Sequence, residues 1–378
     1  MDSTAKHLTE LIRYEICGDV PEIGNFSDEE LKNIFLLSKK HDLAHMAGDA
    51  LLKLNCCNSE TKKKFQKEII TAVYRFEKLE ITLADIRKSL DVPFIPLKGA
   101  VLRQLYPEKW LRTSCDVDIL VKKQDHEKAV EFLREKLNCE QTYKTSHDVS
   151  LSTPNGTHIE IHHTLIEPDI VSDSDSVLEN VWEYAKQKNG FEYELDDEMF
   201  YCYHIAHMAK HFRNAGCGIR PFIDLFILRH RTEYDAEKRR ELIRLAGLEK
   251  FASTAEKLSD IWFSGDEYDE LTLCAEKYLL EGGVYGNTKN SIASKQAQMG
   301  KGKYIMSRIW LPYDDLKGYY ENLDGRRYLL LFYEIRRWFR IVIKERGKNG
   351  IFDLAVGRGI SKNERSEVES MLEEFRIK

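Results

Sequence analysis

The stretch Ser114-Cys115-Asp116-Val117-Asp118-Ile119-Leu120-Val121 decides the fold of this chain. Its strong β-formers predict a strand, in which successive side chains point to opposite faces of a sheet. Asp116 and Asp118 are therefore expected on one face, with the apolar residues that alternate with them in a core on the other. Two carboxylates this close repel and raise each other's pKa, and a divalent ion such as Mg²⁺ removes that cost. We predict a metal site here, and the alternative is an Asp pair in a surface turn.

A second strand pattern, T-H-I-E-I-H-H, covers Thr157 to His163. It follows Asn155-Gly156, a strong signal for a β-hairpin with the alternating run Val149 to Thr153. Glu160 would then point from a strand that can lie beside the aspartate strand, and His162 would share its face. A third carboxylate there could share a metal ion and take a proton from an attacking hydroxyl. The alternative is an exposed Glu on the wet face of a hairpin.

A strand, a turn and a helix are predicted upstream. Val92 to Leu97 forms a short apolar run with edge-type prolines, and Lys98-Gly99-Ala100 leads from it into a helical pattern. The start of a helix offers free backbone N–H groups to an anion, and Lys98 adds a positive charge for a phosphate. The spaced glycines and the Lys-Ser/Thr pair of a P-loop are missing. The alternative is an ordinary turn glycine at Gly99.

Four motifs resemble the DNA polymerase β-like nucleotidyltransferase superfamily: Leu97-Lys98-Gly99-Ala100, Arg112, Asp116-Val117-Asp118 and Ile159-Glu160-Ile161-His162. They look most like its uncharacterised bacterial nucleotidyltransferase family, whose pattern is L-K-G-A, then R, then D-x-D-x-L-V. The resemblance covers roughly residues 35 to 240. One departure is that the superfamily's Gly-Ser turn is Gly99-Ala100 here, so that a hydroxyl contact to phosphates is replaced by backbone or by Lys98.

The resemblance implies an enzyme that transfers a nucleoside monophosphate from an NTP such as ATP to an acceptor and releases pyrophosphate. Asp116, Asp118 and Glu160 would be catalytic and would hold two Mg²⁺ or Mn²⁺ ions. The implied nucleotide-binding residues are Lys98, Gly99, Ala100, Arg112 and Arg213. The acceptor stays open between a small molecule, a peptide or protein side chain and an RNA end. Alternative functions are a nucleotide-binding regulator without catalysis, a kinase-like phosphotransferase and a metal hydrolase.

The resemblance continues at a helix with three histidines, His204, His207 and His211, followed by Arg220 and Asp224. The histidines share one helix face, but a zinc site usually has a further ligand close by. We therefore expect histidines that pack toward the active-site cleft. Arg220 could meet phosphates there. Asp224 is expected to pair with Arg213, with Arg220 or with a histidine.

Composition is compatible with this interpretation. The chain has 378 residues and a formal net charge of −6, which argues against a surface dedicated to coating nucleic acid. Its eight cysteines lack a zinc-type C-x-x-C and are expected to be reduced thiols in the cytoplasm. We predict no membrane span, because no apolar run approaches the roughly 18 residues that one needs. The oligomeric state is not predicted.

The predicted class is mixed α+β, with a small nucleotidyltransferase-type mixed β-sheet core flanked by helices. A capping box at Ser27 and Glu30 opens one helix, and apolar residues at threes and fours predict a long helix from about residue 60 to 90. We divide the chain into a helical N-terminal region (1–90), a nucleotidyltransferase α/β core (91–165), a helical domain packed on it (166–275) and a mainly helical C-terminal region (276–378).

Overall fold

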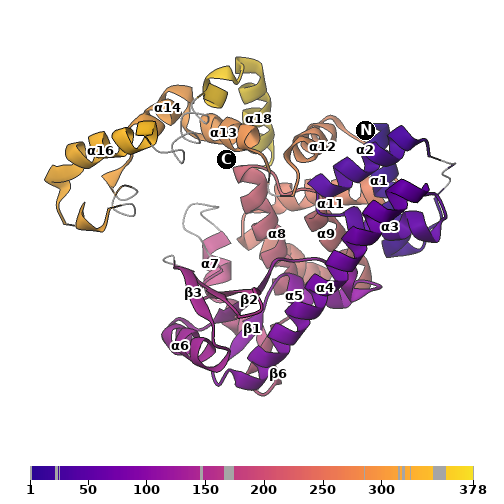
Figure 1. The fold of residues 1–378 in the computed structure, drawn as a ribbon, viewed down its shortest axis with the longest axis horizontal. Helices are drawn as coiled ribbons and strands as arrows, with labels where there is room; N and C mark the ends of the chain where they lie inside the picture. The colour runs from indigo at the N-terminus through magenta and orange to yellow at the C-terminus, as the bar shows by residue number, and fades with distance from the viewer. Residues whose placement is uncertain are drawn as a thin grey trace.

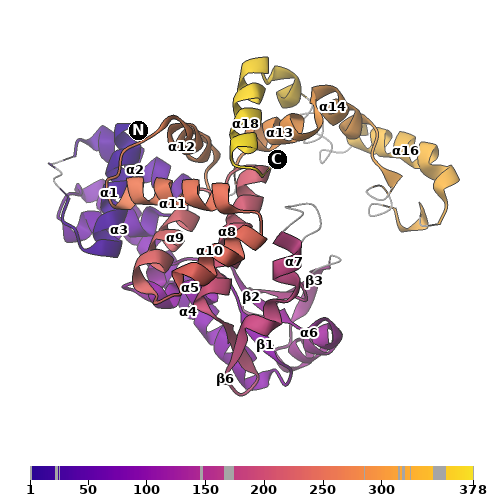
Figure 2. The same ribbon diagram turned by 180° about the vertical axis from the view of Figure 1, so that it is seen from behind.

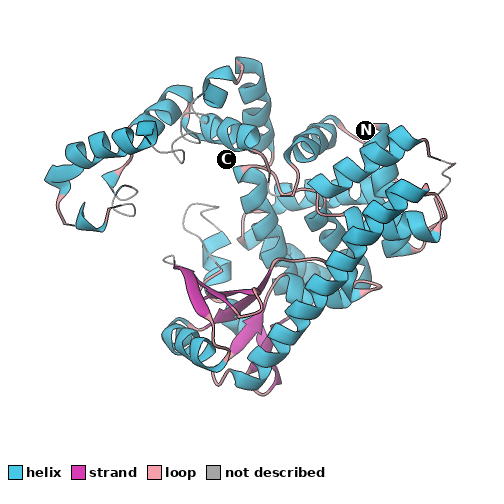
Figure 3. Ribbon diagram, in the orientation of Figure 1, coloured by secondary structure: helices cyan, strands magenta, loops and turns pink. Residues whose placement is uncertain are grey.

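The computed structural model describes residues 2–21, 24, 26–144, 148–165, 174–284, 286–313, 316, 320–323, 325–343 and 355–377. In these residues one mixed β-sheet is embedded in helices, and both terminal regions are helical (Figure 3). The predicted α+β class is therefore confirmed. The predicted domain boundaries stay predictions, and residues 166–173, directly after one of them, lie outside the described ranges.

The sheet has seven strands in the order β3-β4-β5-β2-β1-β7-β6. Their bounds are β1 Phe94–Pro96, β2 Asp116–Val121, β3 Glu140–Lys144, β4 Asp148–Ser152, β5 His158–His162, β6 Ala185–Asn189 and β7 Glu192–Leu195. β2 runs parallel to β5 and antiparallel to β1, and β1 runs parallel to β7. β4 and β5 form the predicted hairpin. The aspartate strand is thus central in the sheet.

Two helices cover one face of this sheet, α4 (Ser59–Ser89) and α6 (His126–Lys136) (Figure 1). The apolar residues that alternate with the aspartates of β2 are buried against them, as predicted. The residues in this cluster include Leu79, Leu83, Ile86, Val117, Ile119, Val121, Ala129, Leu133, Ile159 and Ile161. This packing fixes the strand register, because a slip of one residue would turn Asp116 and Asp118 into the core.

The opposite face is covered by α8 (Asp197–Asn214). Ile95 of β1 and Leu120 of β2 lie in one large buried cluster with Met199 and Tyr203 of α8. The same cluster contains residues of α1 (Ser3–Cys17), α2 (Asp28–Lys40), α3 (Ala44–Lys53), α9 (Arg220–Arg231), α10 (Ala236–Leu245) and α11 (Glu249–Phe263). The capping box of α2 forms as predicted. The N-terminal helices and the helices after the sheet therefore share one core.

The C-terminal region is helical in its described residues. It comprises α12 (Glu270–Gly282), α13 (Thr288–Met299), α14 (Lys301–Ile309), α16 (Leu330–Ile343) and α18 (Lys362–Glu374). α13 packs against α18 and α8, whereas α14 and α16 extend away from the body (Figure 2). No helix in the described part of the chain has the length and apolar character of a membrane span.

The sequence interpretation of residues 166–275 as helical was incomplete. β6 and β7 lie within that range and extend the sheet beside β1. They form a hairpin around Asn189-Gly190, and Gly190 has a positive φ of 53°. Asn-Gly is the same turn signal that predicted the other hairpin. In the first hairpin this signal is flanked by alternating apolar residues. β6 has no such alternation, because all of its residues after Ala185 are exposed.

Candidate functional site

The predicted carboxylates meet on one face of the sheet. In the parallel pair of β2 and β5, Asp118 lies opposite Glu160 and Asp116 lies opposite His158. Paired residues of neighbouring strands point to the same face, so Asp116, Asp118 and Glu160 lie together with His162. This is the arrangement that the two sequence motifs predict. It depends on the register that the core on the other face sets.

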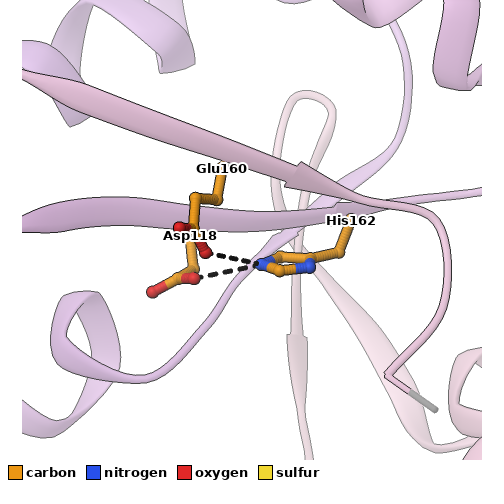
Figure 4. A group of neighbouring side chains, drawn as sticks. All are labelled: Asp118, Glu160 and His162. Atoms are coloured by element: carbon orange, nitrogen blue, oxygen red, sulfur yellow. Dashed lines mark hydrogen bonds and ion pairs between the residues drawn. The ribbon is translucent and has the colours of Figure 1, made fainter. Parts of the chain in front are cut away.

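Asp118 is the centre of a buried charge cluster. Its side chain is only 2% exposed, and its Oδ1 accepts hydrogen bonds from Lys98 Nζ at 2.8 Å and from His162 Nε2 at 3.0 Å. His162 Nε2 also lies 3.4 Å from Glu160 Oε2, and Figure 4 draws the contacts of His162 with Asp118 and Glu160 as dashed lines. Burial opposes ionisation of Asp118, but Lys98 and His162 outweigh it and hold its pKa well below the ordinary value. Burial likewise opposes charge on His162, whereas its two carboxylate partners raise its pKa to about 9.

Asp116 is in the opposite situation. Burial, followed by repulsion from Asp118, raises the pKa of Asp116 to about 6. The expectation that the two aspartates raise each other's pKa is therefore correct for Asp116 and wrong for Asp118. The physical reason is the Lys98 ammonium, which binds Asp118 directly and stabilises its charge. Asp116 has no such direct partner among the described residues, so burial and the negative charge of Asp118 raise its pKa.

Lys98 lies in a tight turn. The Ala100 N–H donates to the Leu97 carbonyl at 3.1 Å, and Lys98 has φ +44° and ψ −119°, a conformation that favours glycine. The helix that follows, α5 (Gly99–Leu102), is only four residues long and continues as a 3-10 turn. The predicted anion site at a regular helix N-terminus is thus reduced to this turn. Ala100 is buried in the sheet core with its N–H already used.

Two arginines that line the same region each form an ion pair with an aspartate. Arg112 Nε donates to Asp224 Oδ1 at 2.7 Å, and the Tyr106 hydroxyl donates to the same oxygen at 2.7 Å. Arg220 Nη1 donates to Asp42 Oδ2 at 2.9 Å. Asp224 was expected to pair with Arg213, Arg220 or a histidine, and this expectation was wrong, because its ion-pair partner is Arg112. The first ion pair joins α9 to the segment before β2, and the second joins α9 to Asp42, between α2 and α3.

The three histidines divide into one that contacts the backbone and two that contact each other. His204 is buried, and its Nε2 lies 3.0 Å from the carbonyl oxygen of Pro221. The Nε2 atoms of His207 and His211 lie 3.1 Å apart and share a hydrogen bond. Burial lowers the pKa of His204 and that of His207. The interpretation as satisfied histidines facing the cleft therefore agrees with the geometry.

These side chains line one cavity of about 470 Å³, between the carboxylate face of the sheet and α8 and α9. Of the sequence-predicted residues it brings together Lys98, Gly99, Arg112, Asp116, Asp118, Glu160, His162, His204, His207, His211, Arg220 and Asp224. Ala100 and Arg213 are not among the described residues that line it. Ser114 lines it as well and was not predicted as a site residue.

The loop after α12 closes one side of the cavity. Val284 lines the cavity, and its N–H donates to the carbonyl oxygen of Lys40 at 3.1 Å. Lys40 Nζ donates in turn to the carbonyl oxygen of Leu280 at 2.9 Å. Gly283 has φ +75°, and a Cβ added to it would lie 2.8 Å from the Lys40 carbonyl oxygen. One wall of the cavity therefore joins the end of α2 to the C-terminal region.

The donor atoms suit a divalent metal ion. Within the described ranges, Asp118, Glu160 and His162 are the group whose potential ligand atoms all lie within 4.8 Å of one another. Carboxylates suit Mg²⁺ and Mn²⁺, and imidazole widens the range to softer ions such as Zn²⁺. Asp116 lies on the same face and can supply a further oxygen. The sequence interpretation placed His162 on the face of Glu160 as a possible cleft residue and did not name it as a metal ligand.

Comparisons with known proteins agree with this geometry. A family model described as "Uncharacterised nucleotidyltransferase" matches residues 27–264, which is more than half of the chain. A search of curated proteins gives no match, and neither does a search of solved structures. The matched range includes the turn, β2, β5, α8 and α9, and thus nearly all of the cavity. The chain therefore belongs to the uncharacterised nucleotidyltransferase family.

Proposed function

We propose that the protein transfers a nucleoside monophosphate from an NTP to an acceptor hydroxyl or phosphate and releases pyrophosphate. The observation that carries this proposal is the in-register pair of Asp118 and Glu160, with Asp116 on the same face at the cavity. Three carboxylates on adjacent strands are the donor set that a metal-dependent phosphoryl displacement uses. The family membership of the chain supports the same class of reaction.

In the proposed reaction the acceptor oxygen attacks the α-phosphorus. The bond from that phosphorus to the bridging oxygen breaks, and its electron pair leaves with pyrophosphate. Glu160 takes the proton of the acceptor. Bound Mg²⁺ or Mn²⁺, held by Asp116, Asp118 and Glu160 with His162 as a further donor, would offset phosphate charge and make the acceptor more acidic.

Binding of the triphosphate is proposed at the turn and the cations beside it. Lys98 and Gly99 line the cavity next to the carboxylates, and Arg112 and Arg220 line its wall. Lys98, Arg112 and Arg220 each already hold a carboxylate. Their net contribution to phosphate binding is therefore reduced, and the metal ions must neutralise a larger part of the negative charge of the triphosphate. This makes NTP binding strongly dependent on the divalent ion.

The test combines binding with product analysis. The four NTPs are screened by thermal shift with Mg²⁺ or Mn²⁺, and pyrophosphate release is then measured with candidate small molecules, peptides and RNA ends. A mass increase of one NMP on an acceptor would support the proposal, and Asp116→Asn should abolish it. NTP binding without pyrophosphate would favour a regulator, whereas NDP with a phosphorylated acceptor would favour a kinase-like enzyme.

The location is proposed to be the cytoplasm. No disulfide bond joins any of the eight cysteines, all of which lie in the described residues, although Cys56 and Cys57 are neighbours in the chain. Cysteines without disulfide bonds are typical of reducing compartments, where NTPs and Mg²⁺ are also available.

A further inference from the structure

Arg103 is a fully buried cation directly behind the turn at residues 97–100, where the triphosphate is proposed to bind. It begins the 3-10 turn Arg103–Leu105 after α5, and it is 1% exposed. Among the residues that the structure describes, it is one of the largest side chains with almost no exposed surface. Burying a guanidinium is costly unless it is fully paired, so its partners indicate what it holds in place.

Three nitrogens of Arg103 bind three different segments. Nε donates to the carbonyl oxygen of Gly99 at 2.7 Å, Nη2 donates to Ser114 Oγ at 2.8 Å, and Nη1 donates to Glu80 Oε1 at 3.3 Å. A guanidinium is planar and rigid, so the positions of these three acceptors are fixed relative to one another. Arg103 therefore joins the turn, the segment directly before β2 and α4.

The contacts of Ser114 carry this connection to the carboxylates. The Ser114 hydroxyl donates to the carbonyl oxygen of Asp116 at 3.2 Å. A Cβ added to Gly99 would lie 3.0 Å from both Cβ and Oγ of Ser114 and 3.3 Å from Nη2 of Arg103. A side chain at position 99 would therefore crowd Ser114 and Arg103, whether or not a phosphate approaches it. Gly99 and Ser114 both line the cavity.

We propose that Arg103 is a positioning residue of the nucleotide site. By holding the Gly99 carbonyl and the Ser114 hydroxyl in one plane, it fixes the distance between the turn that receives the phosphates and the strand that carries Asp116. The proposal rests on the proposed nucleotidyl transfer. A misplacement of about 1 Å in such a site can lower the rate by about 10²-fold.

Three variants test the proposal against a matched control. Arg103→Met removes all three donors at similar length, and Arg103→Lys keeps the charge but cannot bond both acceptors of the fork. Ser114→Ala removes the acceptor of Arg103 Nη2 together with the hydrogen bond to the Asp116 carbonyl oxygen. Glu80→Gln is the control, because it alters the α4 partner of Arg103 and leaves Gly99 and Ser114 held.

Kinetics per folded protein give the first measurement. We expect kcat/KM for the NTP to fall about 100-fold in Arg103→Met and nearly as much in Arg103→Lys, with KM raised and kcat lowered. Ser114→Ala should lose about 10-fold, and Glu80→Gln should match the wild type. A merely structural role would reduce the folded fraction and leave KM unchanged. Wild-type KM and kcat in Arg103→Met and Ser114→Ala, or an equal loss in Glu80→Gln, would overturn the proposal.

Hydrogen–deuterium exchange separates this proposal from the proposed function. Peptides that cover residues 97–116 should exchange faster in Arg103→Met than in Glu80→Gln. If the wild type neither binds an NTP nor releases pyrophosphate, the proposed function fails, and exchange alone then decides whether Arg103 fixes the turn. Equal exchange in the two variants would refute that role.

Discussion

Replacing Asp118 and Asp116 by asparagine should change stability in opposite directions in metal-free protein. Asp118 is 2% exposed and accepts hydrogen bonds from Lys98 and His162. Removing its charge leaves the Lys98 ammonium, 26% exposed, beside a neutral amide. Loss of one partner of a buried ion pair costs about 3–5 kcal/mol. We expect about 3 kcal/mol for Asp118→Asn, because Lys98 keeps the nearby Asp116 carboxylate.

The effect of Asp116→Asn follows from its raised pKa. The pKa of Asp116 rises from 3.8 to about 6 because of burial and of Asp118, so the folded state holds this proton more tightly than the unfolded chain does. The resulting destabilisation is absent below pH 3.8, grows until about pH 6 and is then constant at up to about 3 kcal/mol. Asp116→Asn removes it and should therefore stabilise the protein at pH 8.

The assay is urea unfolding at pH 8 with EDTA, repeated at pH 5, where the gain from Asp116→Asn should be smaller. Asp91→Asn is the control, because Asp91 is 44% exposed in its ion pair with Lys128. It should change the free energy of unfolding by less than about 1 kcal/mol. Stability of Asp118→Asn at or above that of the wild type would refute the reasoning, as would equal losses in both site variants.

Three further changes test separate parts of the structure. Lys98→Gly and Lys98→Ala both remove the ammonium, but only glycine relieves the positive φ, so the glycine variant should be about 1 kcal/mol more stable in urea; the reverse order would contradict the turn geometry. Burial lowers the pKa of His41 to about 4, so the unfolded chain takes up this proton at a higher pH than the folded protein does. The free energy of unfolding should therefore fall by about 3 kcal/mol as the pH falls from 6.5 to 4. His41→Gln should show a smaller loss between pH 7.5 and 4.5, and an equal loss would argue against a neutral buried imidazole. Glu160→Gln should keep NTP affinity by calorimetry and lose pyrophosphate release by about 10²-fold; an equal loss of affinity would assign Glu160 to the nucleotide's metal instead.

The sequence predicted the parts of the fold whose periodicity is strong. β2 and β5 alternate apolar and charged residues because one face is buried against α4 and α6, and that alternation is visible in the chain. β6 was missed although Asn189-Gly190 marks its turn. Its exposed residues carry no apolar period, and its place beside β7 comes from pairing with that strand.

The sequence predicts which residues lie in the site better than it predicts which of them bind each other. Asp116, Asp118 and Glu160 follow from strand geometry, whereas the ion pair of Lys98 with Asp118 depends on a turn whose φ a lysine rarely adopts. Arg103 gave no signal at all, because an arginine after a short helix is normally solvated. Its role depends on contacts with segments 11 and 23 positions away.

The contact between Lys40 and Val284 has a consequence for the nascent chain. The wall of the cavity cannot close until residue 284 has left the ribosome, long after the strand with Asp118 is available to pair. At synthesis rates of about 5–20 residues per second, this interval is roughly 10–30 s. During that time the acidic strands are present without the loop that encloses them. Translation therefore orders the assembly, and this wall of the cavity can form only after the chain has been synthesised past residue 284.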